Sequence, residues 1–187
     1  MTDEHEPAAI RVERRPFSEK EIVLLRQAIE ISEEVISNHF KISTSEWKRY
    51  RYDIQSLKDL SEHEISDHAF AQIHRYACSP NLRLRGSEHL DFLKICLQDH
   101  TIRYALQRDP HIQLFPLTTY IVTHELIHVV RFAKFLQLFH ATEGERESEE
   151  RTVHALTYQL LSALKLEGLP EVLSAFKDWR RMETFMF

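Results

Sequence analysis

Hydrophobic positions recur along most of the chain with the three- to four-residue spacing of an amphipathic helix. The first such segment opens at Ser18, which forms a capping-box pattern with Glu21. Later segments share this spacing, or begin at a proline typical of a first helical turn. The predicted helices lie at 18–40, 61–78 and 87–107, with a short last helix from Pro170. Segment 47–54 interleaves aromatic and basic residues and fits either a short strand or another helix.

Two adjacent segments in the second half of the chain predict a helical hairpin. Residues 117–140 are apolar around most of the helix circumference, which is typical of a buried helix. Thr142 and Glu145 form a second capping-box pattern, so a helix over 143–167 follows almost at once. We therefore expect an all-α fold of five or six helices around a central antiparallel hairpin of segments 117–140 and 143–167.

The composition sets the number of domains and excludes some folds. The chain has 187 residues, of which 43% are hydrophobic, enough for one well-buried domain. We expect a flexible arm over residues 1–16 and a single helical domain over 17–187. With only three glycines, the chain has no glycine-rich phosphate loop, and a turn-rich β fold is disfavoured.

Charge and cysteine usage limit the partners and the compartment. The net charge of −5, without a basic block, gives no electrostatic case for binding nucleic acid or an anionic membrane. The two cysteines, Cys78 and Cys96, have neither metal-binding nor redox spacing. No apolar run predicts a signal peptide or a membrane span. These features predict a cytoplasmic protein whose partner is neither nucleic acid nor membrane.

Residues 124–128 read His-Glu-Leu-Ile-His, and this pentapeptide carries the candidate chemistry of the chain. On a helix, His124 and His128 lie one turn apart on the same face, about 6 Å from each other, so both imidazoles can reach one metal ion. Glu125 lies beside them and can take a proton from a metal-bound water. Burying these polar groups on an apolar helix also costs free energy, which a bound cation offsets. The motif therefore predicts a Zn²⁺ site with its general base.

The H-E-x-x-H pattern, with the helical segments around it over 117–167, resembles the zincin metallopeptidases. The resemblance implies bound Zn²⁺, Glu125 as the catalytic base and a peptide or protein substrate. It also implies that the substrate lies along an edge strand. Residues 111–116 form the only segment near the motif that we expect to serve as this strand.

A catalytic zinc site needs a third protein ligand. Glu147, Glu150 and His154 follow the motif at positions i, i+3 and i+7, on one stripe of the predicted second helix. Glu147 comes after eighteen intervening residues from His128, a spacing similar to that in the aminopeptidase N branch of the gluzincins. The geometry of a tight helical hairpin instead favours His154 as third ligand, with Glu150 as a fourth ligand or as a residue that orients the others.

Other classes of function stay open beside the zinc metallopeptidase. A helical-bundle metalloprotein, either a di-iron carboxylate protein or a mononuclear His/Glu site, would have iron as the alternative metal. In the di-iron case Glu125 would be a direct ligand. A catalytically silent interaction module would keep the metal for stability alone. In the metallopeptidase, His100, Arg103 or His111 is expected near the open coordination position, where it would stabilise an oxyanion.

Overall fold

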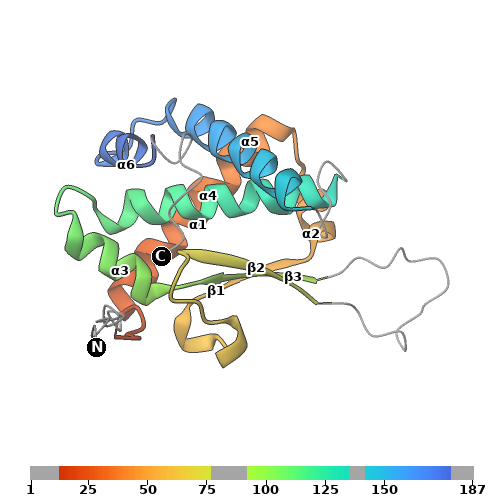
Figure 1. Ribbon diagram of the computed structural model, residues 1–187. Helices are drawn as coiled ribbons and strands as arrows, with labels where there is room; N and C mark the ends of the chain where they lie inside the picture. The colour runs from red at the N-terminus through yellow and green to blue at the C-terminus, as the bar shows by residue number, and fades with distance from the viewer. Residues whose placement is uncertain (1–12, 77–91, 135–141, 178–187) are drawn as a thin grey trace, which may run out of the picture.

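A three-stranded sheet packs beneath the helices, so the expectation of an all-α fold is wrong. The computed structural model describes residues 13–76, 92–134 and 142–177, in which six α-helices accompany the three strands (Figure 1). In chain order the elements are α1 (Glu19–Phe40), α2 (Thr44–Tyr50), β1 (Tyr52–Gln55), two 3-10 turns, η1 (Leu57–Asp59) and η2 (Glu62–Glu64), β2 (Ala71–Tyr76), β3 (Phe92–Leu97), α3 (Asp99–Arg108), α4 (Leu114–Ala133), α5 (Glu143–Leu161) and α6 (Leu169–Ala175).

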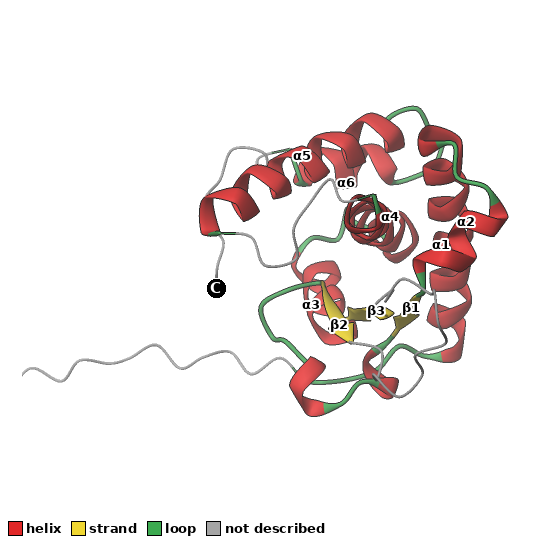
Figure 2. Cartoon of the chain, turned by 90° about the vertical axis from the view of Figure 1, so that its right-hand side faces the viewer, coloured by secondary structure: helices red, strands yellow, loops and turns green. Residues whose placement is uncertain are grey.

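The sheet is mixed and has the strand order β1-β3-β2. β1 runs parallel to the central strand β3, and β2 runs antiparallel to it. Ile54, Ile95 and Ile73 pair across the three strands in one apolar row, with Ile95 completely buried. Figures 1 and 2 show α4 lying over the sheet, with α5 on the outer side of α4. The sheet and α5 therefore enclose α4 from two sides.

The central element is α4, the helix that contains the His-Glu-Leu-Ile-His motif. Every residue from Pro116 to Val130 is buried except Glu125. Each fully buried Leu, Ile or Val side chain stabilises the fold by about 1.5–3 kcal/mol. The start of α6 also packs closely against this helix, because Gly168 takes a positive φ of 76° and a Cβ there would lie 3.1 Å from Pro116 Cγ. These contacts hold the motif on a rigid support.

Several helical predictions are confirmed. Ser18 and Thr142 precede α1 and α5 in the capping boxes that the sequence predicts, and Pro170 lies in the first turn of α6. Segment 47–54 contains the end of a helix, α2, and a strand, β1. The motif helix begins earlier than expected, and its last helical residue is Ala133, seven residues before the expected end at residue 140. Residues 135–141 of that prediction lie outside the described residues.

The helix expected over 61–78 is wrong where the structure describes it, because β2 occupies 71–76, and the helix expected over 87–107 is wrong over 92–97, where β3 lies. Apolar residues four apart, such as Ala69 and Ile73, fit a helix, but Ala71 and Ile73 also alternate with Gln72 and His74 as in a strand. β3 is apolar on both faces for most of its length, which is typical of a central strand and hides its period. Only the second part of the later segment is helical, as α3.

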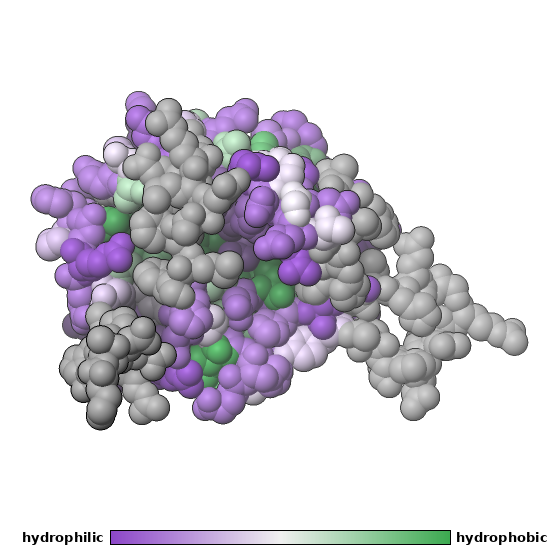
Figure 3. Space-filling view, in the orientation of Figure 1, coloured by the Kyte–Doolittle hydropathy of each residue, from purple (hydrophilic) through white to green (hydrophobic). Residues whose placement is uncertain are grey.

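The surface of the described residues is largely polar. Figure 3 shows mostly hydrophilic side chains on the face that it presents. Among the described residues, the exposed large hydrophobic side chains are Val23, Tyr76 and Tyr158. Within the same ranges, no helix combines the length and the apolar character that crossing a membrane requires.

One carboxylate is buried under the other face of the sheet. Glu64 of η2 is 1% exposed, and its carboxylate accepts hydrogen bonds from Lys94 Nζ (2.8 Å), Ser61 Oγ (2.7 Å) and the Tyr76 hydroxyl. Burial alone would raise the pKa of Glu64, but these bonds hold that pKa well below its ordinary value of 4.5. The ionised Glu64 therefore ties η2 to β2 and β3.

We predict that Glu64→Gln lowers the free energy of unfolding at pH 7 by about 1–3 kcal/mol, because Lys94 loses its charged partner. The pKa of Glu64 is lower in the folded state, so its contribution is present above the ordinary value of 4.5 and is lost as the pH falls below it. Urea unfolding at pH 7 and at about pH 3 measures this, with exposed Asp59→Asn as control. An equal loss of unfolding free energy at both pH values would show that the ionised Glu64 carboxylate is not the source of the stabilisation.

Candidate metal centre

The two histidines of the motif converge on one point beside α4. His124 and His128 are one helical turn apart, and their Nε2 atoms lie 3.3 Å from each other. Their side chains are 11% and 7% exposed, so both imidazoles are largely removed from water. The buried helix therefore presents two nitrogen donors at a single position, as the sequence predicts for this spacing.

Glu150 of α5 supplies the third atom of this group. One oxygen of its carboxylate lies 3.2 Å from His124 Nε2, and the other lies 3.2 Å from His128 Nε2. Burial alone would raise the pKa of Glu150, but hydrogen bonds and charge from the two histidines hold it below its ordinary range. Half of the Glu150 side chain, 51%, remains exposed. The group is thus enclosed by α4 and open on the side of α5.

The spacing of these donor atoms fits a tetrahedral zinc ion. Zn²⁺ binds imidazole nitrogen and carboxylate oxygen at about 2.0–2.1 Å, which places tetrahedral donors about 3.3–3.4 Å apart. His124 Nε2 and His128 Nε2 are 3.3 Å apart, and each lies 3.2 Å from a different oxygen of the Glu150 carboxylate. Two imidazoles and one carboxylate are also the donor set of known catalytic zinc sites, in which a fourth position is left open. These three residues would hold the ion.

An ion pair beside the group sets the register of the two helices. Arg131 of α4 donates to both carboxylate oxygens of Glu149, the residue before Glu150, and both side chains are mostly buried. A bidentate pair of this kind fixes orientation as well as distance. Because α4 ends at Ala133, only a short stretch of α5 precedes the position opposite the two histidines. Glu150 lies at that position. Glu147 lies one turn earlier, on the exposed surface of α5.

His154 lies one turn further along α5, next to the same group. Its donor atom and those of His124 and Glu150 all lie within 4.8 Å of one another, and its ring centroid is 4.4 Å from that of His124. Its Nδ1 is hydrogen-bonded to the hydroxyl of Tyr120 at 2.9 Å. The structure thus brings His154 to the site, with one ring nitrogen engaged by Tyr120.

Tyr120 is a residue that the sequence analysis did not single out. It lies one turn before His124 on α4, is 4% exposed, and stacks on Phe176 with ring centroids 4.4 Å apart. A signal was present in the sequence, since a position four residues before the first histidine lies on the same helical stripe. Tyr120 and Phe176 fix the position of the His154 ring.

Glu125 is the one residue between Pro116 and Val130 that keeps part of its surface accessible. The protein around its carboxyl group nevertheless removes water, which raises the pKa of Glu125 above its ordinary value, while His124 and His128 act in the opposite direction. A carboxylate beside a group of metal donors, with access to solvent, is suited to exchange protons with a water molecule.

The edge of the sheet near α4 is formed by β2. Gln98 N donates to Phe70 O at 2.8 Å, which fixes the phase of the hydrogen bonds along the antiparallel ladder. In that phase the backbone groups of Ala71 and Ile73 point away from β3, and no strand among the described residues pairs with that side. Figure 2 shows β2 at the edge of the sheet that lies farther from α1. Residues 111–116, the segment expected for this role, form no strand, because they lie in the loop before α4 and in its first turn.

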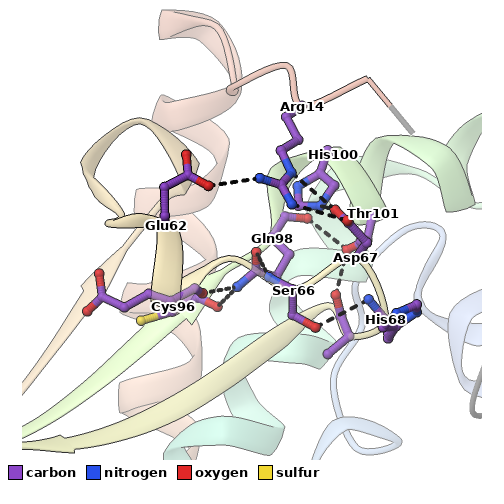
Figure 4. Close-up of polar contacts among 11 residues, drawn as sticks. Arg14, Glu62, Ser66, Asp67, His68, Cys96, Gln98, His100 and Thr101 are labelled. Carbon is purple, nitrogen blue, oxygen red and sulfur yellow. Dashed lines mark hydrogen bonds and ion pairs between the residues drawn. The ribbon is translucent and has the colours of Figure 1, made fainter. Parts of the chain in front are cut away.

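The chain immediately before β2 is anchored by polar side chains (Figure 4). The backbone N–H of Ser66 donates to Gln98 Oε1 at 3.0 Å, and the Thr101 hydroxyl donates to Ala69 O at 2.7 Å. Figure 4 also shows Arg14, which pairs with Asp67 at 3.2 Å. The edge strand is therefore held in place by α3 and by the described end of the N-terminal segment.

The three residues considered as oxyanion donors are placed elsewhere. His100 is completely buried, and its Nε2 lies 2.9 Å from Asp67 Oδ1. Arg103 donates to Pro16 O at 3.2 Å and pairs with Glu21. The side chain of His111 is exposed in the loop before α4. These contacts connect α3 to the N-terminal segment and to the loop before β2, and not to the motif.

No family model, no curated protein and no solved structure matches the chain. The contacts of this chain's own residues therefore indicate its function. Among them, His124 and His128 lie close to each other and to the two carboxylate oxygens of Glu150.

We predict that Glu150→Gln weakens zinc binding more than the matched substitution Glu147→Gln on the same helix. Loss of a group that only orients a ligand commonly costs 10–100-fold in affinity, so loss of a ligand should cost more than about 100-fold. His154→Ala should have an intermediate effect, because His154 lies beside the group. Zinc titration against a competing chelator measures all three. A protein that loses zinc with Glu147→Gln and keeps it with Glu150→Gln would contradict this ligand set.

Proposed function

We propose that the protein is a zinc-dependent hydrolase that cleaves peptide bonds, with His124, His128 and Glu150 as the protein ligands of the ion. The observation that carries this proposal is the convergence of the two imidazole nitrogens, 3.3 Å apart, on the Glu150 carboxylate, each 3.2 Å from one of its oxygens. Two histidines and one carboxylate are a donor set that suits a catalytic zinc ion. Zinc, when bound, supplies a Lewis acid that polarises a carbonyl and makes a water molecule more acidic. The resemblance of the motif to the zincins leads to the same function.

In this proposal, different residues around the ion transfer the proton and stabilise the developing negative charge. Glu125 takes a proton from the attacking water and delivers it to the leaving amine. His154 and Tyr120, which are hydrogen-bonded to each other beside the donor group, face the negative charge that develops on the carbonyl oxygen. Their position replaces the one expected for His100, Arg103 or His111.

The edge strand supports a peptide as the substrate. An extended peptide can add to a strand edge through main-chain hydrogen bonds, in the phase set by Ala71 and Ile73 of β2. Such binding holds the substrate in an extended conformation and recognises the backbone rather than one side chain. The resemblance to zincins implies a strand in this role, and the sheet supplies it.

The mixed sheet weighs against the di-iron alternative. A ferritin-like di-iron protein uses four helices with a Glu from two of them and a Glu-x-x-His motif from each of the others. The described part of this chain has one such motif, Glu125 to His128, and builds its core from helices and a sheet. A metal-stabilised module without activity would bind zinc as the hydrolase does but would not cleave peptides, so a measurement of activity distinguishes the two.

We predict that Glu125→Gln keeps the bound zinc and lowers the rate of peptide hydrolysis by roughly 10²–10⁴, because the substitution removes the proton acceptor alone. Exposed Glu143→Gln on α5 is the matched control and should leave both properties unchanged. The measurements are metal content and cleavage of a fluorogenic peptide library. Wild-type hydrolysis by Glu125→Gln would remove Glu125 from the reaction, and loss of the metal would indicate that Glu125 is itself a ligand.

A further inference from the structure

A surface groove is formed by elements other than those of the candidate metal centre. Residues of α1, α2 and β1 line a surface groove of about 680 Å³, and none of the lining residues belongs to α4 or α5. Figure 2 shows these three elements together at one side of the molecule. The lining residues are Ile29, Glu30, Glu33, Glu34, Ser37, Thr44, Trp47, Lys48, Tyr52, Asp53 and Ile54. The groove is therefore formed by parts of the chain that the proposed function does not use.

Two aromatic side chains in the groove are held in fixed positions. Trp47 Nε1 donates to Ser37 Oγ at 2.6 Å, and the Tyr52 hydroxyl donates to Glu33. The two rings lie with their centroids 5.4 Å apart at an angle of 60°. Because both polar ends are bound to α1, the rings are already ordered before any ligand arrives. An ordered Trp or Tyr ring attracts a cation that approaches its face.

The opposite wall of the groove is negatively charged. Glu30, Glu33, Glu34 and Ser37 lie at i, i+3, i+4 and i+7, so they form one stripe of α1. Neither Glu30 nor Glu34 forms an ion pair or hydrogen bond with another described side chain. With Asp53, four carboxylates face the groove, and Lys48 is the one cationic residue among those that line it. The groove is complementary to a positively charged ligand.

Three residues of β1, Tyr52, Asp53 and Ile54, also line the groove, and no strand among the described residues pairs with the outer side of β1. Leu93 N donates to Arg51 O at 3.0 Å, which fixes the phase of the parallel pairing between β1 and β3. In this phase the backbone groups of Tyr52 and Ile54 point away from β3. The N–H of Ile54 donates to Asp53 Oδ1 at 2.9 Å, which leaves the N–H and C=O of Tyr52 as the groups on this side for a further strand to pair with. A strand edge of this kind is a template for a further extended segment.

We propose that this groove binds an extended, lysine- or arginine-bearing segment of a partner protein. The backbone of the segment pairs with β1 at Tyr52, and its cationic side chains contact Glu30, Glu34 and the rings of Trp47 and Tyr52. Charge complementarity selects a basic segment, and the strand edge selects an extended one. Neither contact involves the metal ligands, so the interaction is independent of the proposed hydrolysis.

The test measures binding of a fluorescein-labelled peptide of alternating lysine and threonine to the full chain, by fluorescence anisotropy. The protein carries Glu125→Gln in all samples, which prevents cleavage from affecting the result. The double substitution Glu30→Gln with Glu34→Gln is expected to weaken binding about tenfold, because two exposed charge contacts are lost. The control, Asp59→Asn with Glu167→Gln, removes two exposed carboxylates elsewhere and is expected to leave the dissociation constant unchanged.

A second pair of peptides separates strand pairing from charge attraction. N-methylation of alternate amides of the same peptide keeps its charge and blocks main-chain hydrogen bonds, so it should weaken binding. A glutamate-threonine peptide of the same length should not bind. Equal affinity for the two double variants would overturn the assignment to this groove. Undiminished binding of the N-methylated peptide would overturn the extended, strand-paired mode.

Discussion

The structure depends on the meeting of two buried imidazoles from α4 with one carboxylate from α5. Polar groups taken out of water need a partner that compensates the lost hydration. His124 and His128 find that partner in Glu150, at 3.2 Å from each ring nitrogen. The same two imidazoles and carboxylate are a donor set that zinc prefers, so the contact that compensates burial is also suited to hold a metal ion.

The neighbouring features maintain that contact. The Arg131–Glu149 pair fixes the position of α5 along α4, and the stacking of Tyr120 on Phe176 places the hydroxyl that holds His154. Beneath α4, the sheet supplies an apolar floor and, at one side, the edge strand β2. Because α5 covers only one side of the group and Glu150 is half exposed, the site combines rigid ligands with access for water and substrate.

Those elements whose signals are local were predicted from the sequence. Capping boxes at Ser18 and Thr142 fixed where α1 and α5 begin, and the spacing of His124 and His128 placed both rings on one face of α4. The sheet was missed because β3 is buried on both faces and lacks alternation, while β2 contains apolar residues that also fit a helical period. Strand pairing joins segments that are distant in sequence, so the hydrophobic spacing within one segment does not reveal it.

The choice of third ligand illustrates the same limit. Glu147, Glu150 and His154 share one helical stripe, so their order in the sequence leaves all three possible. The geometry of a hairpin with a longer first helix favours His154. The end of α4 at Ala133 shortens the return and brings the carboxylate of Glu150 to the histidines, with His154 beside it. The structure thus brings both predicted residues, Glu150 and His154, to the histidines, whereas Glu147 lies on the exposed surface of α5.

The measurement that tests the central claim most directly is the metal content of the purified protein, determined by elemental analysis together with protein concentration. A mononuclear site of two histidines and one glutamate predicts about one zinc per chain, removed by a chelator and restored by added zinc. Two irons per chain would contradict the proposal in favour of a dinuclear carboxylate site. A protein that binds no metal would show that His124, His128 and Glu150 form only a buried ion-paired cluster.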